Sequence, residues 1–268
     1  MAFYKFKPTT SGEQLFSYIT KNLIGRKSIN QIYELEALQI GGRQHQLSTY
    51  YIGILTANIL TRCLKKANRI VSLFEDEREH QKLIIQYFQR SLEIPRAPYG
   101  ADLDRLATLT LEAEKKSRKG IISSIRSQFS TTKVNYCYIC GFPVFEKPLE
   151  MQVKMQLEHI WPQSFGGDSI TENLLPACPT CNNDKSDMLL WQNAHIHSFT
   201  LKPEPSSQEL ENIGRRLRIA QHRRDIFEYA STNKTTLKEA AIAIGSVNIS
   251  EISAIDRDDA VDFFNFSF

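Results

Sequence analysis

Apolar and polar positions divide the chain into three zones, and the first has a helical pattern. From about residue 10 to 95, apolar residues recur every three or four positions. The clearest run consists of Ile29, Ile32, Tyr33, Ala37 and Ile40. This pattern predicts several helices, with a break at Gly41-Gly42 and a linker or turn at residues 94–100. A further helix is expected over residues 102–128.

The most apolar stretch is YYIGILTANILTRCL, residues 50–64. It is too short to span a bilayer and is interrupted by Thr, Asn and Arg. We therefore expect a buried helix with Cys63 in the core. Because the first residues lack a signal-peptide pattern, we also expect a soluble, cytoplasmic protein that does not enter a membrane.

The middle zone, residues 131–200, changes from helical spacing to short strand patterns. MQLEHI predicts a strand ending at His159, and NLLPA predicts a strand that returns after a loop turning at Gly166-Gly167. The polar run at residues 182–187 is expected to form the first turn of a helix. Met188, Trp191 and His195 would share one face of that helix. The predicted order is strand, strand, helix.

The third zone, residues 201–268, begins with the linker LKPEPSS and continues with a basic helix. TTLKEAAIAIGSVNISEI then resembles the turn region of helix-turn-helix units, although an ordinary Ala-rich amphipathic helix followed by Gly has the same pattern. The end of the chain, DRDDAVDFFNFSF, combines acids with four phenylalanines. Such a tail should dock, either on the chain's own core or on a partner protein.

Charge must be considered locally, because 33 Lys and Arg residues nearly balance 30 Asp and Glu residues, leaving a net charge of +3. The 41% of hydrophobic residues is ample for a buried core. Two clusters of cations stand out, each either a solvated helix face or a surface that contacts phosphates. The first cluster is Lys115, Lys116, Arg118, Lys119, Arg126 and Lys133. The second is Arg215, Arg216, Arg218, Arg223 and Arg224.

Four of the five cysteines form two C-x2-C pairs. Cys137 and Cys140 are separated from Cys178 and Cys181 by 37 residues. Two such pairs can close a tetrahedral thiolate site around Zn²⁺, and a site filled by four protein ligands is structural. A thioredoxin-like redox motif would need only one pair on a βαβ unit. The sequence therefore predicts structural zinc.

Between and around these pairs, the motifs EHIWPQSFGG, ENLLPAC and CNNDKSD resemble the HNH endonucleases, which have a ββα-metal fold. The resemblance covers roughly residues 135–195. HIWPQSFGGDSITENLL is also similar to the HNH domain of RNA-guided CRISPR nucleases. Together with the helical patterns on both sides, the resemblance to HNH endonucleases implies an α+β, predominantly α-helical protein with a zinc-stabilised HNH module between helical flanks.

The resemblance also implies roles for single residues. His159 would be the general base, because a neutral imidazole accepts a proton at physiological pH. Glu158 and Asn182 would hold a divalent ion, Mg²⁺ or Mn²⁺, through oxygen ligands. Asn173 would orient the loop near the histidine. Lys185 would contact a phosphate, or would be an ordinary solvent-exposed lysine.

These inferences predict a helical N-terminal domain (1–130), an HNH nuclease module (131–200) and a helical C-terminal region with an acidic-aromatic tail (201–268). The predicted function is metal-dependent hydrolysis of DNA by an HNH endonuclease. Large helical flanks around a lone nuclease module suggest control by a partner and favour a phage-defence or restriction effector. Double-stranded DNA is favoured because both basic clusters suit a duplex backbone. The predicted contacts are Lys185, Lys115, Lys116, Arg118, Lys119, Arg215 and Arg216. The alternative is a non-catalytic zinc-ribbon module that binds nucleic acid or supports assembly.

Overall fold

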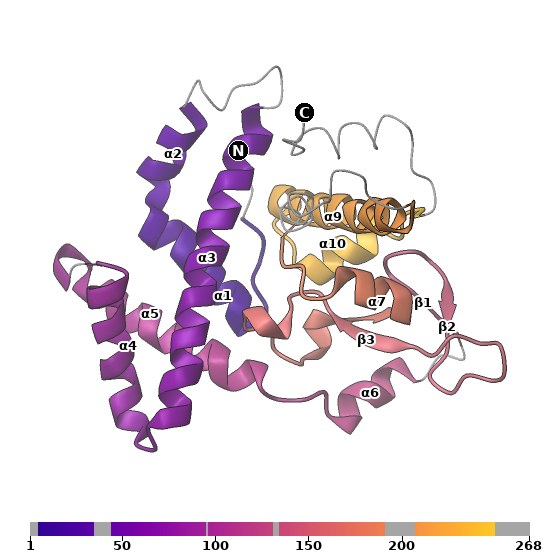
Figure 1. Ribbon diagram of the computed structural model, residues 1–268, viewed down its shortest axis with the longest axis horizontal. Helices are drawn as coiled ribbons and strands as arrows, with labels where there is room; N and C mark the ends of the chain where they lie inside the picture. Colours follow the sequence, from indigo (N-terminus) through magenta and orange to yellow (C-terminus); the bar gives the residue numbers. More distant parts are fainter. Residues whose placement is uncertain (1–4, 35–43, 95, 131–133, 191–206, 250–268) are drawn as a thin grey trace. The chain divides into compact units, whose positions relative to one another are not determined.

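The computed structural model describes residues 5–34, 44–94, 96–130, 134–190 and 207–249 (Figure 1). The chain forms two compact units. One, here called the helical unit, comprises residues 8–120 and 161–169. The other, here called the cysteine unit, comprises residues 1–7, 121–160 and 170–268. Each unit is described by itself below.

The helical unit contains most of the predicted N-terminal helices. Its elements are α1 (Ser11–Tyr18), the π-helix η1 (Ile19–Gly25), α2 (Arg26–Glu34), α3 (Gln44–Leu73), α4 (Glu77–Ser91) and α5 (Arg96–Ser117). Helix α5 packs against α1, α3 and α4. Thr10 and Glu13 form a capping box that starts α1 by satisfying backbone N–H groups. Cys63 is fully buried in α3, as predicted.

Two helix boundaries in this region were predicted wrongly. Residues 96–100 are not a linker but the first turns of α5, where Pro98 is tolerated because the first N–H groups have no partner within the helix. The helix expected over residues 102–128 is two helices, since α5 ends at Ser117 and α6 covers Ser123–Phe129. Gly120 lies between them, and glycine is unfavourable inside a helix. The predicted break at Gly41-Gly42 lies outside the described residues.

Residues 161–169 pack on α1 through several specific contacts. The backbone N–H of Gly12 donates to Gly166 O at 2.8 Å, and both the N–H and the hydroxyl of Ser11 donate to Asp168 Oδ2. The rings of Trp161 and Phe16 meet edge to face, with centroids 5.3 Å apart. A Cβ on Gly12 would lie 2.3 Å from Phe165 O, so this approach requires glycine.

The cysteine unit contains the two strands predicted from sequence. β3 (Gln156–His159) and β4 (Leu174–Ala177) are antiparallel, with His159 opposite Leu174. A second small antiparallel sheet pairs β1 (Asn135–Tyr136) with β2 (Pro143–Val144). The described chain is thus predominantly helical with two small sheets, which confirms the predicted α+β class.

The helix after β4 starts and ends earlier than predicted. α7 covers Pro179–Lys185, with Cys178 as its N-cap and proline in the first turn, where proline is favoured. It stops because Ser186 adopts a positive φ of 47°. Met188 is therefore not on a helix, and Trp191 and His195 lie outside the described residues.

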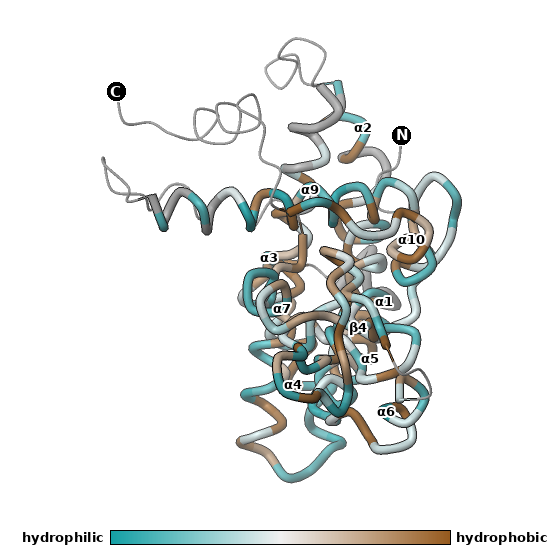
Figure 2. Tube along the Cα trace, turned by 90° about the vertical axis from the view of Figure 1, so that its right-hand side faces the viewer, coloured by the Kyte–Doolittle hydropathy of each residue, from teal (hydrophilic) through white to brown (hydrophobic). Residues whose placement is uncertain are grey.

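Two helices close the described part of the cysteine unit. α9 (Ser207–Asn233) is largely hydrophilic, whereas α10 (Leu237–Ile244) is largely hydrophobic (Figure 2). α9 packs against both α7 and α10. Residues 201–206 of the predicted linker and the tail from residue 250 onward lie outside the described residues. Among the described helices, none has the length and apolar character needed to cross a membrane.

Candidate metal centre and active site

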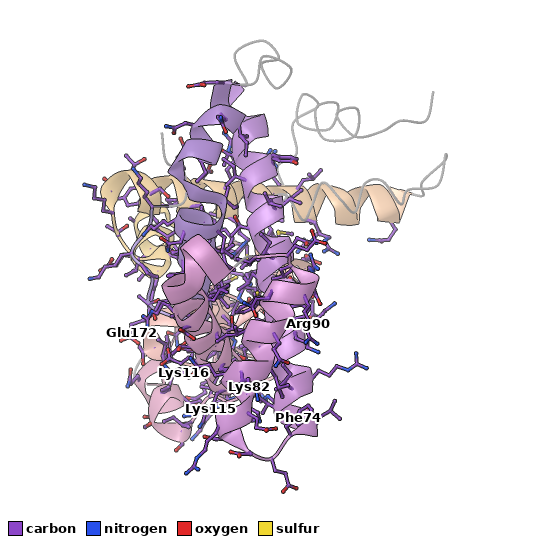
Figure 3. All side chains as sticks on the ribbon, turned by 90° about the vertical axis from the view of Figure 1, so that its left-hand side faces the viewer. Phe74, Lys82, Arg90, Lys115, Lys116 and Glu172 are labelled. Atoms are coloured by element: carbon purple, nitrogen blue, oxygen red, sulfur yellow. The ribbon has the colours of Figure 1, made fainter. Side chains whose placement is uncertain are left out.

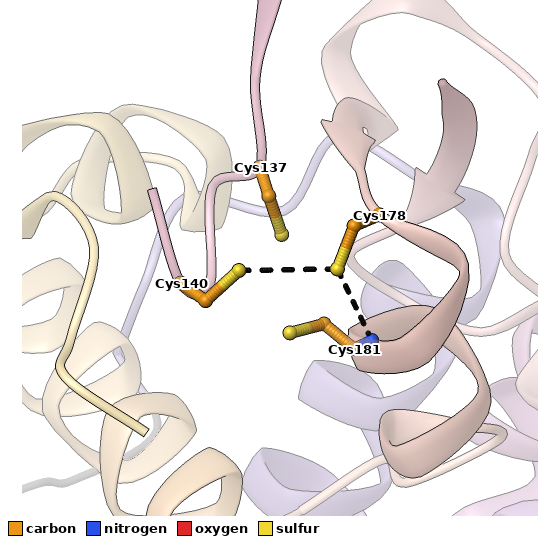
Figure 4. A group of neighbouring side chains, drawn as sticks. All are labelled: Cys137, Cys140, Cys178 and Cys181. Carbon is orange, nitrogen blue, oxygen red and sulfur yellow. Dashed lines mark hydrogen bonds between the residues drawn. The ribbon is translucent and has the colours of Figure 1, made fainter. Parts of the chain in front are cut away.

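The four paired cysteines come together at one point of the cysteine unit (Figure 4). Cys137 and Cys140 lie in the turn after β1, while Cys178 caps α7 and Cys181 lies in its first turn. Their sulfur atoms all lie within 4.8 Å of one another. Gly141 follows with a φ of 72°, a conformation that glycine adopts without strain. None of the five cysteines, all of which lie within the described residues, forms a disulfide.

The arrangement fits a structural zinc ion. Tetrahedral Zn²⁺ with bonds of about 2.3 Å places its sulfur ligands about 3.8 Å apart. Cys140 Sγ and Cys178 Sγ are 3.8 Å apart. Hydrogen bonds from Cys140, and then from Cys178 and Cys181, lower the pKa of the Cys137 thiol, whereas hydrogen bonds within the same cluster raise the pKa of the Cys140 and Cys181 thiols. The cluster has the donor set and spacing that the sequence predicted for zinc.

A second group of polar residues lies where α7 contacts β3. Gln156 and Glu158 are two residues apart on β3 and therefore point to the same side of the strand. The amide of Asn182 on α7 donates to Gln156 Oε1 at 2.6 Å. One turn later, the ammonium of Lys185 donates to Glu158 Oε1 and, at 3.0 Å, to His159 O. The structure thus brings three of the predicted site residues, Glu158, Asn182 and Lys185, to one contact between helix and strand.

Lys185 is buried, with 0% of its surface exposed, so the alternative of a solvent-exposed lysine is wrong. Glu158 is buried as well. Burial lowers the pKa of Lys185 to about 8, and the charge of Glu158 opposes this shift. Burial, followed by the charge of Glu158, also raises the pKa of the nearby Tyr138 hydroxyl. The sequence did not identify Gln156 or Tyr138 as members of this group, because neither belongs to a metal-ligand spacing.

His159 occupies the last position of β3 and is half-buried. Adjacent strand residues normally point to opposite sides, so a carboxylate and an imidazole at neighbouring positions can serve one site only where the strand ends, as β3 does at His159. Burial, and then the charge of Lys185, lowers the pKa of His159 to about 4. The imidazole is therefore uncharged at neutral pH. Just beyond it, Ile160 N donates to Asn173 O at 2.8 Å, which joins the strand end to the residue before β4.

The first basic cluster is divided between the two units. Lys115 and Lys116 lie at the end of α5 (Figure 3), where the exposed Lys115 forms an ion pair of 3.3 Å with Glu77. Arg118 pairs with Glu114, and the carbonyl of Lys119 accepts a hydrogen bond from Ser169. Arg126 lies on α6 of the cysteine unit, and Lys133 lies outside the described residues.

The second basic cluster includes an internal arginine. Arg223 is 2% exposed and donates to the carbonyls of Leu189 and Ile160, so assigning it to a nucleic-acid surface was wrong. Its position could have been found from the sequence, because apolar residues flank it at helical spacing. These residues are Ile219, Ala220, Ile226 and Phe227. Arg215 is partly exposed and donates to Asp184 at 2.8 Å.

The segment that contains these features matches a known protein family. Residues 137–188 match the HNH endonuclease family. The HNH segment spans both cysteine pairs, β3, β4 and α7. Its match indicates nuclease activity and therefore interaction with nucleic acid. No curated protein and no solved structure matches the chain.

Proposed function

We propose that this protein is a metal-dependent HNH endonuclease that hydrolyses phosphodiester bonds of DNA. The observation that carries the proposal is the arrangement within the HNH segment. An uncharged imidazole at the end of β3 adjoins a buried carboxylate that faces α7. Hydrolysis requires a proton acceptor for the attacking water and a positive charge near the phosphate. The imidazole would be the proton acceptor, and the carboxylate would hold the divalent ion that supplies the charge.

In the proposed mechanism, His159 takes a proton from water at a ring nitrogen. Glu158 and Asn182 are the oxygen ligands of a divalent ion, because carboxylate and amide oxygens suit Mg²⁺ or Mn²⁺. When bound, the ion neutralises charge on the scissile phosphate and on the departing oxygen. A cation is already accommodated beside Glu158, since Lys185 donates to its carboxylate. Asn173 has a positioning role near the strand end, where its carbonyl accepts from Ile160.

The zinc site contributes to this mechanism indirectly. Zinc held by Cys178 and Cys181 fixes the start of α7, and Asn182 is the next residue after the second of these ligands. Cys137 and Cys140 tie the same ion to the turn between β1 and β2. The zinc therefore positions Asn182 with respect to β3 without entering the reaction.

Double-stranded DNA is the proposed substrate, with phosphate contacts from Lys115, Lys116, Arg118, Lys119, Arg215 and Arg216. Lys185 is proposed to reach a phosphate only after it leaves Glu158. We further propose a role in phage defence or restriction under the control of a partner protein. The partner would dock on the acidic-aromatic tail, which lies outside the described residues.

One observation favours a second candidate function. The buried carboxylate of Glu158 is neutralised by the chain's own Lys185. Such a pair is also compatible with a non-catalytic zinc module that binds nucleic acid, in which Glu158 and Lys185 only join β3 to α7.

Plasmid cleavage separates the two functions. Supercoiled plasmid is incubated with purified protein and Mg²⁺ or Mn²⁺, and the wild type is compared with His159→Ala and Glu158→Gln. Loss of a general base lowers a rate by a factor of about 10² to 10⁴. We expect His159→Ala to lose cleavage by such a factor while retaining zinc and its melting temperature. Glu172→Gln is the matched control, because Glu172 is an exposed acid in the same unit.

Near-wild-type cleavage by His159→Ala would remove this residue from the mechanism. Binding of nucleic acid by the wild type without cleavage of DNA or RNA would support the non-catalytic candidate.

A further inference from the structure

A lysine of the chain lies where the proposed catalytic metal would bind. We propose that Lys185 is an internal counter-cation, which occupies the Glu158 carboxylate in the metal-free protein and must leave it before a divalent ion binds. Lys185 then sets the metal affinity of the site. This inference rests on the proposed function, because Glu158 is a metal ligand only within that proposal.

Burial explains why the pair forms. The side chain of Lys185 is 0% exposed and that of Glu158 is 9% exposed. Moving an isolated ammonium or carboxylate out of water costs several kcal/mol, and that cost is offset only by a charged partner with good hydrogen bonds. The Lys185 ammonium has such partners in Glu158 Oε1 and His159 O. In the metal-free protein, Lys185 therefore supplies the charge that the carboxylate requires.

The Lys185 ammonium and a divalent metal ion cannot both bind the Glu158 carboxylate. A divalent ion binds a carboxylate oxygen at about 2.0 to 2.6 Å. An ammonium hydrogen-bonded to the same carboxylate would lie within a few ångströms of that ion, and like charges repel strongly in a buried site. Metal binding therefore exchanges one cation for another and does not simply add charge to an empty carboxylate.

The surroundings of Lys185 allow it to leave. It is the last residue of α7, so its long, flexible side chain, although fully buried, would leave by a rearrangement at the end of the helix and not in its interior. A second buried cation, Arg223, donates to Ile160 O, one residue beyond the carbonyl that accepts from Lys185. Two cations at one strand end disfavour each other, which lowers the cost of moving Lys185.

Metal binding can be measured separately from catalysis. Mn²⁺ affinity is determined by titration calorimetry on the full-length, zinc-loaded protein at constant pH. The variants are Lys185→Met, Glu158→Gln and the double variant. Removing Lys185 leaves Glu158 without a counter-charge, so we expect Lys185→Met to lower the Kd for Mn²⁺ by about tenfold or more. Both variants that lack the carboxylate should lose this binding. Lys154→Met is the matched control, because Lys154 is exposed in the same unit.

A second measurement uses the wild type and does not depend on whether Lys185→Met folds. Lysine amines are acetylated with a chemical reagent, with and without saturating Mn²⁺, and the modified residues are identified by mass spectrometry. We expect Lys185 to be protected without Mn²⁺ and to become labelled with it, while labelling of Lys154 stays constant.

The outcomes separate this inference from the proposed function. Glu158-dependent Mn²⁺ binding that is equally strong in Lys185→Met and in the wild type would overturn the inference alone. Persistent protection of Lys185 at saturating Mn²⁺ would overturn it as well. If the wild type shows no Glu158-dependent Mn²⁺ binding, the proposed catalytic metal site fails, and this inference fails with it.

Discussion

At the scale of single residues, Arg223 shows that a cation in a basic helix can be a structural residue. Its guanidinium donates to the carbonyls of Leu189 and Ile160, which lie on segments far from α9 in sequence. It also lies over the ring of Phe227, with 5.8 Å between Cζ and the ring centroid. One side chain thus satisfies backbone groups both at the end of β3 and after α7.

Replacing Arg223 should destabilise the cysteine unit. Arg223→Ala would leave buried carbonyls without donors and remove hydrogen bonds made by a charged group, which contribute about 1.5 to 3 kcal/mol each. We expect the free energy of unfolding to fall by about 3 kcal/mol, measured by urea denaturation. The control is Arg224→Ala at the neighbouring, half-exposed position, where a change within about 0.5 kcal/mol is expected. Equal losses in both variants would contradict the special role of Arg223.

His222 should make stability depend on pH. Burial lowers its pKa, although the hydrogen bond to Gly245 O opposes the shift. The unfolded chain therefore binds the proton first as pH falls below about 6.5. The stabilising contribution of neutral His222 is present above that pH and is lost as the pH decreases toward the lower folded pKa.

His222→Gln retains an N–H donor but does not titrate in this range. We expect the free energy of unfolding to decrease more in the wild type than in His222→Gln between about pH 7 and about pH 5. Denaturation at both pH values measures the difference. Parallel losses in the two proteins would show that His222 is not responsible.

At the scale of elements, α7 is a short helix that begins at the cysteine cluster. It has only seven residues, and isolated helices of that length are marginal in water. Cys178 accepts a hydrogen bond from Cys181 N at 3.4 Å, so the residues that bind zinc also cap the helix. A zinc ion held by this cluster would therefore also fix the start of the helix that carries Asn182.

Cys181→Ser should abolish stoichiometric zinc binding and unfold the HNH segment, because thiolate coordination supplies much of the folding free energy of a small zinc module. Zinc content by atomic absorption and melting temperature are the measurements. Cys63→Ser is the matched control, since Cys63 is also buried but lies in α3 of the helical unit. The control should retain full zinc content. A soluble, zinc-free and fully active Cys181→Ser protein would refute the structural role of the metal.

At the scale of the whole molecule, a net charge of only +3 leaves nucleic-acid binding to local clusters. Lys115 and Lys116 are adjacent at the end of α5, and Lys115 is 70% exposed (Figure 3). The ion pair of Lys115 with the exposed Glu77 contributes little free energy, because both side chains are solvated. A phosphate can therefore compete with Glu77 for this lysine.

If both lysines contact phosphates, Lys115→Ala combined with Lys116→Ala should weaken DNA binding uniformly across sequences. Each lost contact should reduce the slope of log K against log salt concentration by about 0.9. Fluorescence anisotropy with a labelled duplex at several salt concentrations measures the slope. Lys65→Ala, at an exposed position on α3, serves as the control. An unchanged slope in the double variant would exclude these lysines from the interface.

The sequence by itself predicted the parts of this molecule that depend on local patterns. Strands β3 and β4 were predicted because the strand pattern and the turn residues that bound it involve only a few neighbouring positions. The spacing of the four cysteines predicted the cluster that the structure forms. The motifs around His159 predicted the match to HNH endonucleases. The roles of His159, Glu158, Asn173 and Asn182 stay predictions.

Only the tertiary structure decided where helices end and which cations are buried, although the apolar neighbours of Arg223 at helical spacing were a sequence signal for its burial. α7 starts at Pro179 because Cys178 caps it, and it stops at Ser186, where φ becomes positive. Lys185 and Arg223 have the same chemistry as exposed cations, and no property of a lysine or arginine alone shows where it lies. Their burial follows from the faces of α7 and α9 that meet the rest of the cysteine unit, and those faces are set by contacts between residues distant in sequence.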